Sequence, residues 1–100
     1  MKKLIATLAL AALFAAPALA LDGKALYAEK ACNSCHGEAG ASVTSIYPKL
    51  NGQTAGYIAT QAIAIRDGVR KSGMSAIMKP MVASISNEEM EAIADYLASK

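Results

Sequence analysis

The residues whose types and spacing could carry chemistry stand near the start of the chain. Cys32 and Cys35 are separated by two residues, and His36 directly follows the second cysteine. Residues three apart share one face of a helical turn, so both thiols can point to the same side of the backbone. Cys-x-x-Cys-His is the motif of covalent haem attachment, in which the thiols form thioethers and the histidine binds the iron. We expect one covalently bound haem c with His36 as an iron ligand.

Three other kinds of cysteine site explain this motif less well. An exported protein can form a structural disulfide, but a disulfide leaves the adjacent histidine without a role. A thioredoxin-like redox pair requires a βαβ context, and the sequence shows no alternating strand pattern. A structural zinc site usually has four Cys or His ligands, whereas Cys32, Cys35 and His36 are the only such residues in the chain. Haem attachment is the interpretation that uses all three residues.

A second iron ligand must come from another part of the chain. Because His36 is the only histidine, methionine is the natural choice, and His/Met ligation raises the reduction potential of a haem. Met74, Met78 and Met81 precede the last predicted helix, whereas Met90 lies on the apolar stripe of that helix and is better explained as core. The three earlier methionines cannot be ranked from the residues alone, since methionine also fills gaps in a core or against a haem edge.

Residues 1–20 have the features of a secretory signal peptide. Two lysines precede an uncharged apolar stretch, Pro17 interrupts it, and Ala18-Leu19-Ala20 supplies the small residues of a cleavage site. The apolar stretch is short for a membrane span, which needs about 20 residues. We expect cleavage after Ala20, no permanent membrane anchor, and a mature domain of residues 21–100.

The mature chain would be small and balanced in charge. The whole chain has 10 basic and 8 acidic residues, and removal of Lys2 and Lys3 would leave equal numbers of each. This balance does not indicate a surface for nucleic acid. The remaining residues form one domain, and its only aromatic side chains are tyrosines. Because a domain of this size has a thin core, a large apolar cofactor would help to complete it.

The hydrophobic pattern predicts an all-α domain. A first helix is expected over residues 23–31, with Asp22 at its N-cap and the cysteine motif directly after it. A second helix is expected over residues 55–67, where apolar residues recur at helical spacing. Thr54 is its candidate N-cap, and Gly68 is a natural C-terminal stop.

The C-terminal part of the chain contains the clearest helix start. Ser86 and Glu89 have the spacing of a capping box, which predicts a last helix running to about Ser99. Residues 69–84 show little periodicity and contain Pro80, so we expect mostly loop there.

Taken together, these motifs resemble those of the class I cytochromes c over essentially the whole mature chain. The resemblance rests on the helix running into Cys32-Asn33-Ser34-Cys35-His36-Gly37, on Pro48-Lys49-Leu50-Asn51-Gly52, and on the late helix that carries Tyr96. The segment Ile77-Met78-Lys79-Pro80-Met81 further resembles the corresponding segment of the bacterial c-four type, so the chain is similar to one domain of those proteins. The resemblance implies a small class I cytochrome c fold, with three to four helices around one covalently bound haem.

The resemblance also implies roles for residues around the iron. Family spacing places the iron-ligating methionine eight residues before the capping Ser86, which is Met78, with Met81 as the runner-up. The backbone carbonyl of Pro48 would accept a hydrogen bond from the second ring nitrogen of His36 and so fix its tautomer.

Further roles follow from the same resemblance. The first and last helices would cross near Gly23 and Tyr96, where the missing glycine side chain permits close approach. Tyr57, Gln61 and Arg66 could reach the haem propionates, and a packed or solvated helix face explains them equally well.

An iron with two protein ligands has no open position for a substrate, so we expect electron transfer rather than an enzyme. The expected protein is periplasmic, passes electrons between a donor and an acceptor redox protein, and is a monomer or homodimer. Ala39, Ala41 and Val43 are candidates for the rim that a partner approaches. One alternative is a cytochrome subunit of a larger dehydrogenase, such as a sulfide-oxidising flavocytochrome. Another is gas binding or peroxidase chemistry, which requires that no methionine binds the iron.

Overall fold

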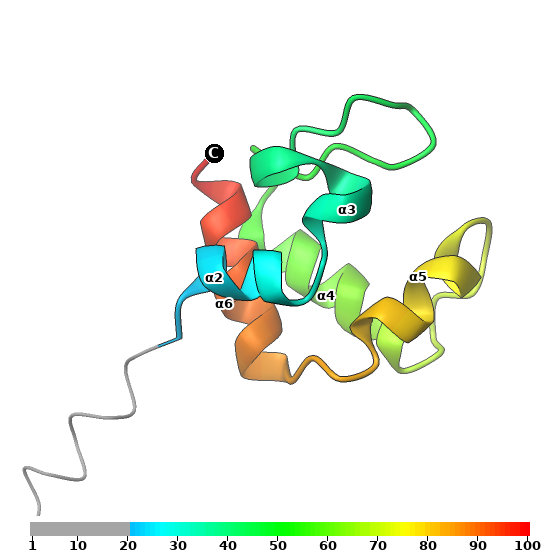
Figure 1. Cartoon of the computed structure of the whole chain (residues 1–100). Helices are drawn as coiled ribbons and strands as arrows, with labels where there is room; N and C mark the ends of the chain where they lie inside the picture. Colours follow the sequence, from blue (N-terminus) through cyan, green and yellow to red (C-terminus); the bar gives the residue numbers. More distant parts are fainter. Residues whose placement is uncertain (1–20) are drawn as a thin grey trace, which may run out of the picture.

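A computed structural model describes residues 21–100, and the expected signal peptide lies outside the described residues. All regular structure between residues 21 and 100 is helical, which confirms the predicted all-α fold. Four helices have seven residues or more, and α3 is a single turn. In chain order the elements are α2 (Gly23–Glu29), α3 (Asn33–His36), a 3-10 turn (Glu38–Gly40), α4 (Ala55–Arg66), α5 (Ser75–Val82) and α6 (Asn87–Ala98) (Figure 1).

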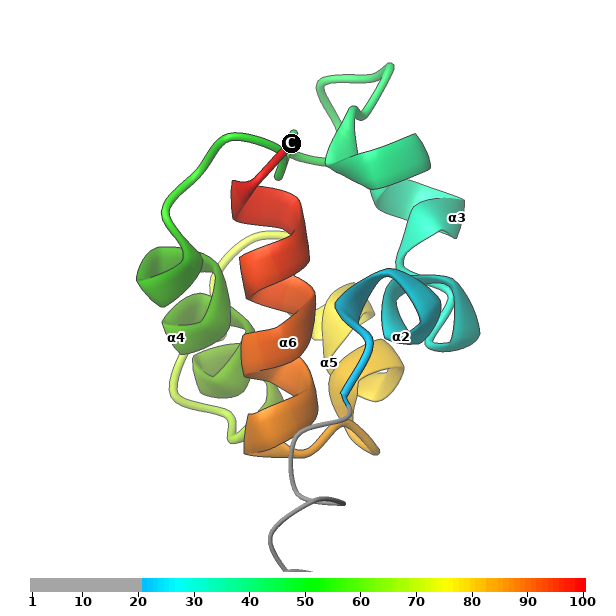
Figure 2. The ribbon, with the colours of Figure 1, turned by 90° about the vertical axis from the view of Figure 1, so that its left-hand side faces the viewer.

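Helix α6 lies at the centre of the fold. It packs against α2 and against α4 (Figure 2). Helix α5 packs against α4. The apolar stripe on which Met90 was expected consists of four residues that are each 3% exposed or less, namely Met90, Ile93, Ala94 and Leu97. The apolar residues that recur along α4 are also buried, namely Ile58, Ala62 and Ile65. The core is therefore built from the faces that the hydrophobic periodicity indicates. Within residues 21–100 no helix combines the length and the apolar character that crossing a membrane requires.

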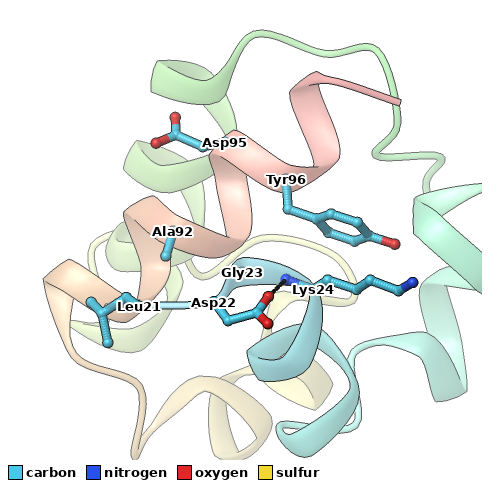
Figure 3. A pocket seen from close by; sticks show the side chains of 7 residues that line it. All are labelled: Leu21, Asp22, Gly23, Lys24, Ala92, Asp95 and Tyr96. Atoms are coloured by element: carbon cyan, nitrogen blue, oxygen red, sulfur yellow. Dashed lines mark hydrogen bonds between the residues drawn. The ribbon is translucent and has the colours of Figure 1, made fainter. Parts of the chain in front are cut away.

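The first and last helices cross at Gly23, as the sequence resemblance implied. Figure 3 shows Gly23 of α2 beside Ala92 and Tyr96 of α6. A Cβ atom on Gly23 would collide with the carbonyl oxygen of Ala92 and would lie 2.9 Å from the Cβ of Tyr96. Only glycine therefore permits this separation between the two helix backbones.

Helix α2 begins where the sequence predicts and ends two residues earlier than expected. The Asp22 carboxylate accepts a hydrogen bond from the backbone N–H of Lys24 at 3.1 Å (Figure 3). It also accepts one from the backbone N–H of Ala25 at 3.2 Å. The helix ends at Glu29, and Ala31 adopts a left-handed backbone with φ of 59°. The chain thus turns immediately before Cys32, and the cysteine motif occupies its own short helix.

Helix α4 ends in a Schellman motif at the glycine that the sequence indicates. Gly68 has φ of 78° and donates to the carbonyl of Ile65 at 3.2 Å, while Val69 donates to the carbonyl of Ala64 at 2.8 Å. These bonds satisfy carbonyls that the helix end would otherwise leave free. At the other end Thr54 has the extended backbone of an N-cap, but its side chain makes no capping hydrogen bond.

Helix α6 begins with the predicted capping box. The Ser86 hydroxyl accepts from the Glu89 N–H at 3.1 Å, and the Glu89 carboxylate accepts from the Ser86 N–H at 2.9 Å. Two N–H groups at the start of the helix are satisfied in this way.

Helix α5 corrects the prediction that residues 69–84 are mostly loop. Ser75–Val82 is helical although Pro80 lies within it, and Val82 is 3% exposed in the core. A proline inside a helix removes one backbone hydrogen bond, which is why the sequence argued against a helix here. Packing of α5 against α4 compensates for the lost bond.

Candidate functional site

An apolar cavity of about 430 Å³, here called the central cavity, is lined by residues from every helix between α2 and α6. Its volume falls within the range of about 300–1,000 Å³ typical of cofactor sites. Aliphatic side chains from α4, α5 and α6 and the segment before α6 form its wall, and they include Ile58, Ala62, Ile65, Val82, Ile85, Ile93 and Leu97. The predicted site residues Cys32, Cys35, His36 and Met78 all line it.

The two cysteines are brought together by the single turn of α3. The His36 N–H donates to the carbonyl of Cys32 at 2.9 Å, so the whole motif follows one helical turn. Both thiols are free and half-buried on the cavity lining. Burial raises the pKa of the Cys32 thiol. This arrangement presents two thiols and one imidazole to the same apolar space.

The imidazole of His36 is buried, with 8% of its surface exposed. Its Nδ1 atom lies 2.8 Å from the carbonyl oxygen of Pro48, as the resemblance implied. A carbonyl oxygen can only accept a hydrogen bond, so Nδ1 carries the ring proton. In the neutral imidazole this leaves Nε2 as the nitrogen with a lone pair for a metal.

The three candidate methionines differ in burial. Met74, Met78 and Met81 all line the central cavity. Met78 is half-buried and packs against the hydrophobic core, whereas Met74 is 47% and Met81 44% exposed. Met90 is 3% exposed and belongs to the core of α6, as its position on the apolar stripe indicates.

The arginine that lines the cavity is Arg70, which the sequence did not single out. Arg66 donates to Asp67 at 2.8 Å and to the carbonyl of Ile85 at 2.9 Å, and it does not line the central cavity. Arg70 does line it and donates to Gln61 at 3.2 Å. The Schellman turn after α4 returns the chain toward the cavity, which helical periodicity cannot predict.

The residues of the central cavity fit a covalently bound haem. The wall is largely apolar, two thiols lie on one helical turn, and the ring of a buried histidine is held through Nδ1 by a backbone carbonyl. A methionine thioether on the same cavity supplies the donor type that His/Met ligation requires.

Comparison with known proteins gives a consistent result. The family model described as Cytochrome c matches residues 20–100. The chain is 44% identical over 69 residues to cytochrome c-554(548) of Halomonas halodenitrificans, covering 69% of this chain and 83% of that protein. It is 37% identical over 82 residues to cytochrome c4 of Pseudomonas aeruginosa, covering 80% of this chain and 41% of that protein.

A third relative is the thiosulfate dehydrogenase electron acceptor of Stutzerimonas stutzeri. It is 38% identical over 68 residues, which are 68% of this chain and 32% of that protein. The chain thus spans most of the cytochrome c-554(548) but less than half of the other two relatives. Family match, fold and motif agree that this chain belongs to the cytochrome c family, whose members carry electrons on a haem c bound covalently through Cys-x-x-Cys-His.

Proposed function

We propose that residues 21–100, after removal of an N-terminal signal peptide, act as a periplasmic electron carrier that is not itself an enzyme. Cys32 and Cys35 would hold the single haem c through thioethers, and His36 and Met78 would be the two protein ligands of its iron. The observation that carries this proposal is that all four side chains line the same apolar cavity.

Burial supports Met78 over Met81 as the second ligand. Both side chains line the central cavity, but Met78 alone of the two packs against the core. A ligand held by core packing is positioned before it binds the iron, whereas Met81 is 44% exposed and would lose more freedom on binding. Half-burial thus supports the same residue that the family spacing indicates.

When bound, haem c supplies reversible one-electron oxidation and reduction of its iron. The chain contributes three things to that chemistry. His36 offers the Nε2 lone pair, because its Nδ1 proton is held by the Pro48 carbonyl. The Met78 thioether would be the second protein ligand of the iron, which would leave no place for a substrate. The aliphatic wall would keep water away from the iron, which would favour the ferrous state because the ferric centre carries one more positive charge.

The visible spectrum of the holoprotein tests this ligation. A ferric iron bound by methionine has a characteristic charge-transfer band, which we expect in the wild type and not in Met78→Ala. Met81→Ala is the matched control, because it removes a neighbouring methionine of the same cavity, and it should retain the band. Survival of the band in Met78→Ala with its loss in Met81→Ala would assign the ligand to Met81. Absence of the band from the wild type would favour gas binding or peroxidase chemistry at an iron without a methionine ligand.

A second candidate function is that of a bound subunit or dedicated electron acceptor of a dehydrogenase. The relative named as a thiosulfate dehydrogenase electron acceptor favours it. A dedicated subunit should remain with its dehydrogenase during purification. Size-exclusion chromatography of the holoprotein from its native source distinguishes the two candidate functions. A stable heterodimer supports the dehydrogenase subunit, and elution at the mass of one or two copies of this chain supports the free electron carrier.

A further inference from the structure

The side chain of Tyr27 occupies a position that the proposed electron-transfer site does not yet explain. Its ring is 3% exposed, lies on the wall of the central cavity, and faces Tyr96 with ring centroids 5.8 Å apart. Its hydroxyl donates to the carbonyl of Gly37 at 2.6 Å and accepts from the N–H of Gly40 at 3.1 Å. A phenol has one proton to donate, so the hydroxyl is used in both directions.

The two partners of this hydroxyl belong to the segment that follows the histidine. Gly37 comes directly after His36, and Gly40 ends the 3-10 turn. Both glycines have positive φ, of 81° and 77°. A Cβ on Gly40 would lie 2.8 Å from Leu97 and 2.9 Å from the N atom of Asn51, so this segment is tightly enclosed. The Tyr27 hydroxyl therefore spans a turn with little freedom to shift.

The same turn also holds the segment that contacts the histidine ring. The carbonyl of Gly40 accepts from the N–H groups of Leu50, at 2.9 Å, and Asn51, at 3.3 Å. Two residues before Leu50, the carbonyl of Pro48 receives the Nδ1 proton of His36 at 2.8 Å. Hydrogen bonds thus link Tyr27 to the backbone directly after His36 and, through Gly40, to the segment that carries the acceptor of the Nδ1 proton.

We propose that Tyr27 is a positioning residue for His36. Its hydroxyl ties the 37–40 turn to α2 and thereby holds the Pro48 carbonyl at hydrogen-bond distance from Nδ1. A firmly held Nδ1–H bond makes Nε2 a stronger donor to a metal. A stronger donor stabilises the ferric state, so the hydroxyl of Tyr27 lowers the reduction potential of the holoprotein. The inference rests on the proposed role of His36 as a ligand.

The test is Tyr27→Phe in the holoprotein, which keeps the ring against Tyr96 and removes only the hydroxyl. The substitution loses both hydrogen bonds of the hydroxyl, and one such bond is worth about 1 kcal/mol, so the Nδ1 proton of His36 should exchange with solvent at least about fivefold faster, as measured by NMR. The reduction potential should rise. Tyr96→Phe is the matched control, because within residues 21–100 its hydroxyl makes no hydrogen bond, and it should change neither quantity.

Two outcomes would overturn the inference. One is a Tyr27→Phe holoprotein with unchanged Nδ1 exchange and unchanged potential, which would leave Tyr27 with a packing role only. The other is an equal change in Tyr96→Phe, which would assign the effect to the aromatic pair. Should Tyr27→Phe fail to fold, hydrogen exchange of the wild-type holoprotein tests the inference instead. The amide proton of Gly40 and the Nδ1 proton of His36 should then be protected from exchange by the same factor. Clearly different protection would show that the turn and the histidine ring open independently, and would overturn the inference.

The methionine–iron band distinguishes failure of this inference from failure of the proposed ligation. The band depends on Met78 and reports the second ligand, whereas Nδ1 exchange reports the side of the site formed by His36. A wild type without the band would remove Met78 from the proposal and would leave the Tyr27 comparison intact.

Discussion

The Nδ1 atom of His36 lies 2.8 Å from the carbonyl oxygen of Pro48, twelve residues further along the chain. This contact fixes which ring nitrogen carries the proton of the neutral imidazole, and therefore which one keeps a lone pair for a metal. The position of this carbonyl oxygen depends on the path of the backbone around Pro48, and the proline ring fixes one backbone angle there.

Replacement of that proline should loosen the contact without removing the carbonyl. Pro48→Ala increases the freedom of the unfolded chain and of the loop, so we expect a loss of roughly 0.5–1 kcal/mol in the free energy of unfolding. Denaturant unfolding measures this loss. Faster exchange of the His36 Nδ1 proton should accompany it, and exchange as slow as in the wild type would show that the loop is held by its other contacts.

The crossing of α2 and α6 depends on the absence of a side chain at Gly23. In Gly23→Ala the added Cβ would collide with the carbonyl oxygen of Ala92, a backbone atom that cannot move aside. We expect a loss of about 3 kcal/mol or more in the free energy of unfolding, measured by denaturant titration. Gly56→Ala in α4 is the control, since nothing lies within 4 Å of its added Cβ. It should be neutral or stabilising by up to about 1 kcal/mol, and a similar loss in both variants would contradict the steric explanation.

The capping box of α6 predicts a dependence of stability on acid. A hydrogen bond from the Ser86 N–H, assisted by the Ser86 hydroxyl and by Lys30, lowers the pKa of Glu89 below its ordinary value of 4.5. The folded state thus favours the carboxylate. The stabilisation is complete above pH 4.5 and is lost as the pH falls through the lower pKa of the folded state.

We therefore expect Glu89→Gln to be less stable than the wild type at neutral pH and to approach it in acid. Thermal unfolding of both proteins at a series of pH values from neutral to acid measures this difference in stability. Glu91→Gln changes an exposed carboxylate on the same helix outside the capping box and should show no such convergence. A gap that stays constant with pH would mean that the carboxylate charge of Glu89 is not what stabilises the helix start.

The buried phenol of Tyr27 predicts a loss of stability at alkaline pH. Burial raises the pKa of Tyr27 from 10.0 to about 12. Because the folded state favours the protonated hydroxyl, its contribution is complete below pH 10 and is lost as the pH rises through about 12. Denaturant midpoints of the wild type should fall over this interval more than those of Tyr27→Phe. Tyr57→Phe, in which the lost hydroxyl is on a side chain 55% exposed, should follow the wild type. Parallel curves for the wild type and Tyr27→Phe would exclude the phenol as the titrating group.

Features that depend on neighbours along the chain were predictable. The caps at Asp22 and Ser86 and the stop at Gly68 each use atoms within five residues of one another, so their patterns are visible in the sequence. The Cys-x-x-Cys-His motif belongs to the same class, because one helical turn holds it. By itself, the sequence therefore determined the cofactor chemistry, the all-α class and most helix boundaries.

Only the tertiary structure decided how distant segments meet. The helix over Ser75–Val82 forms against α4 despite Pro80, the degree of burial separates Met78 from Met81, and Arg70 rather than Arg66 reaches the central cavity. The hydroxyl of Tyr27 finds its partners ten and thirteen residues away, across a turn with two left-handed glycines. Such contacts depend on the packing of whole helices, and the free energy of that packing is shared among many side chains rather than carried by a local pattern.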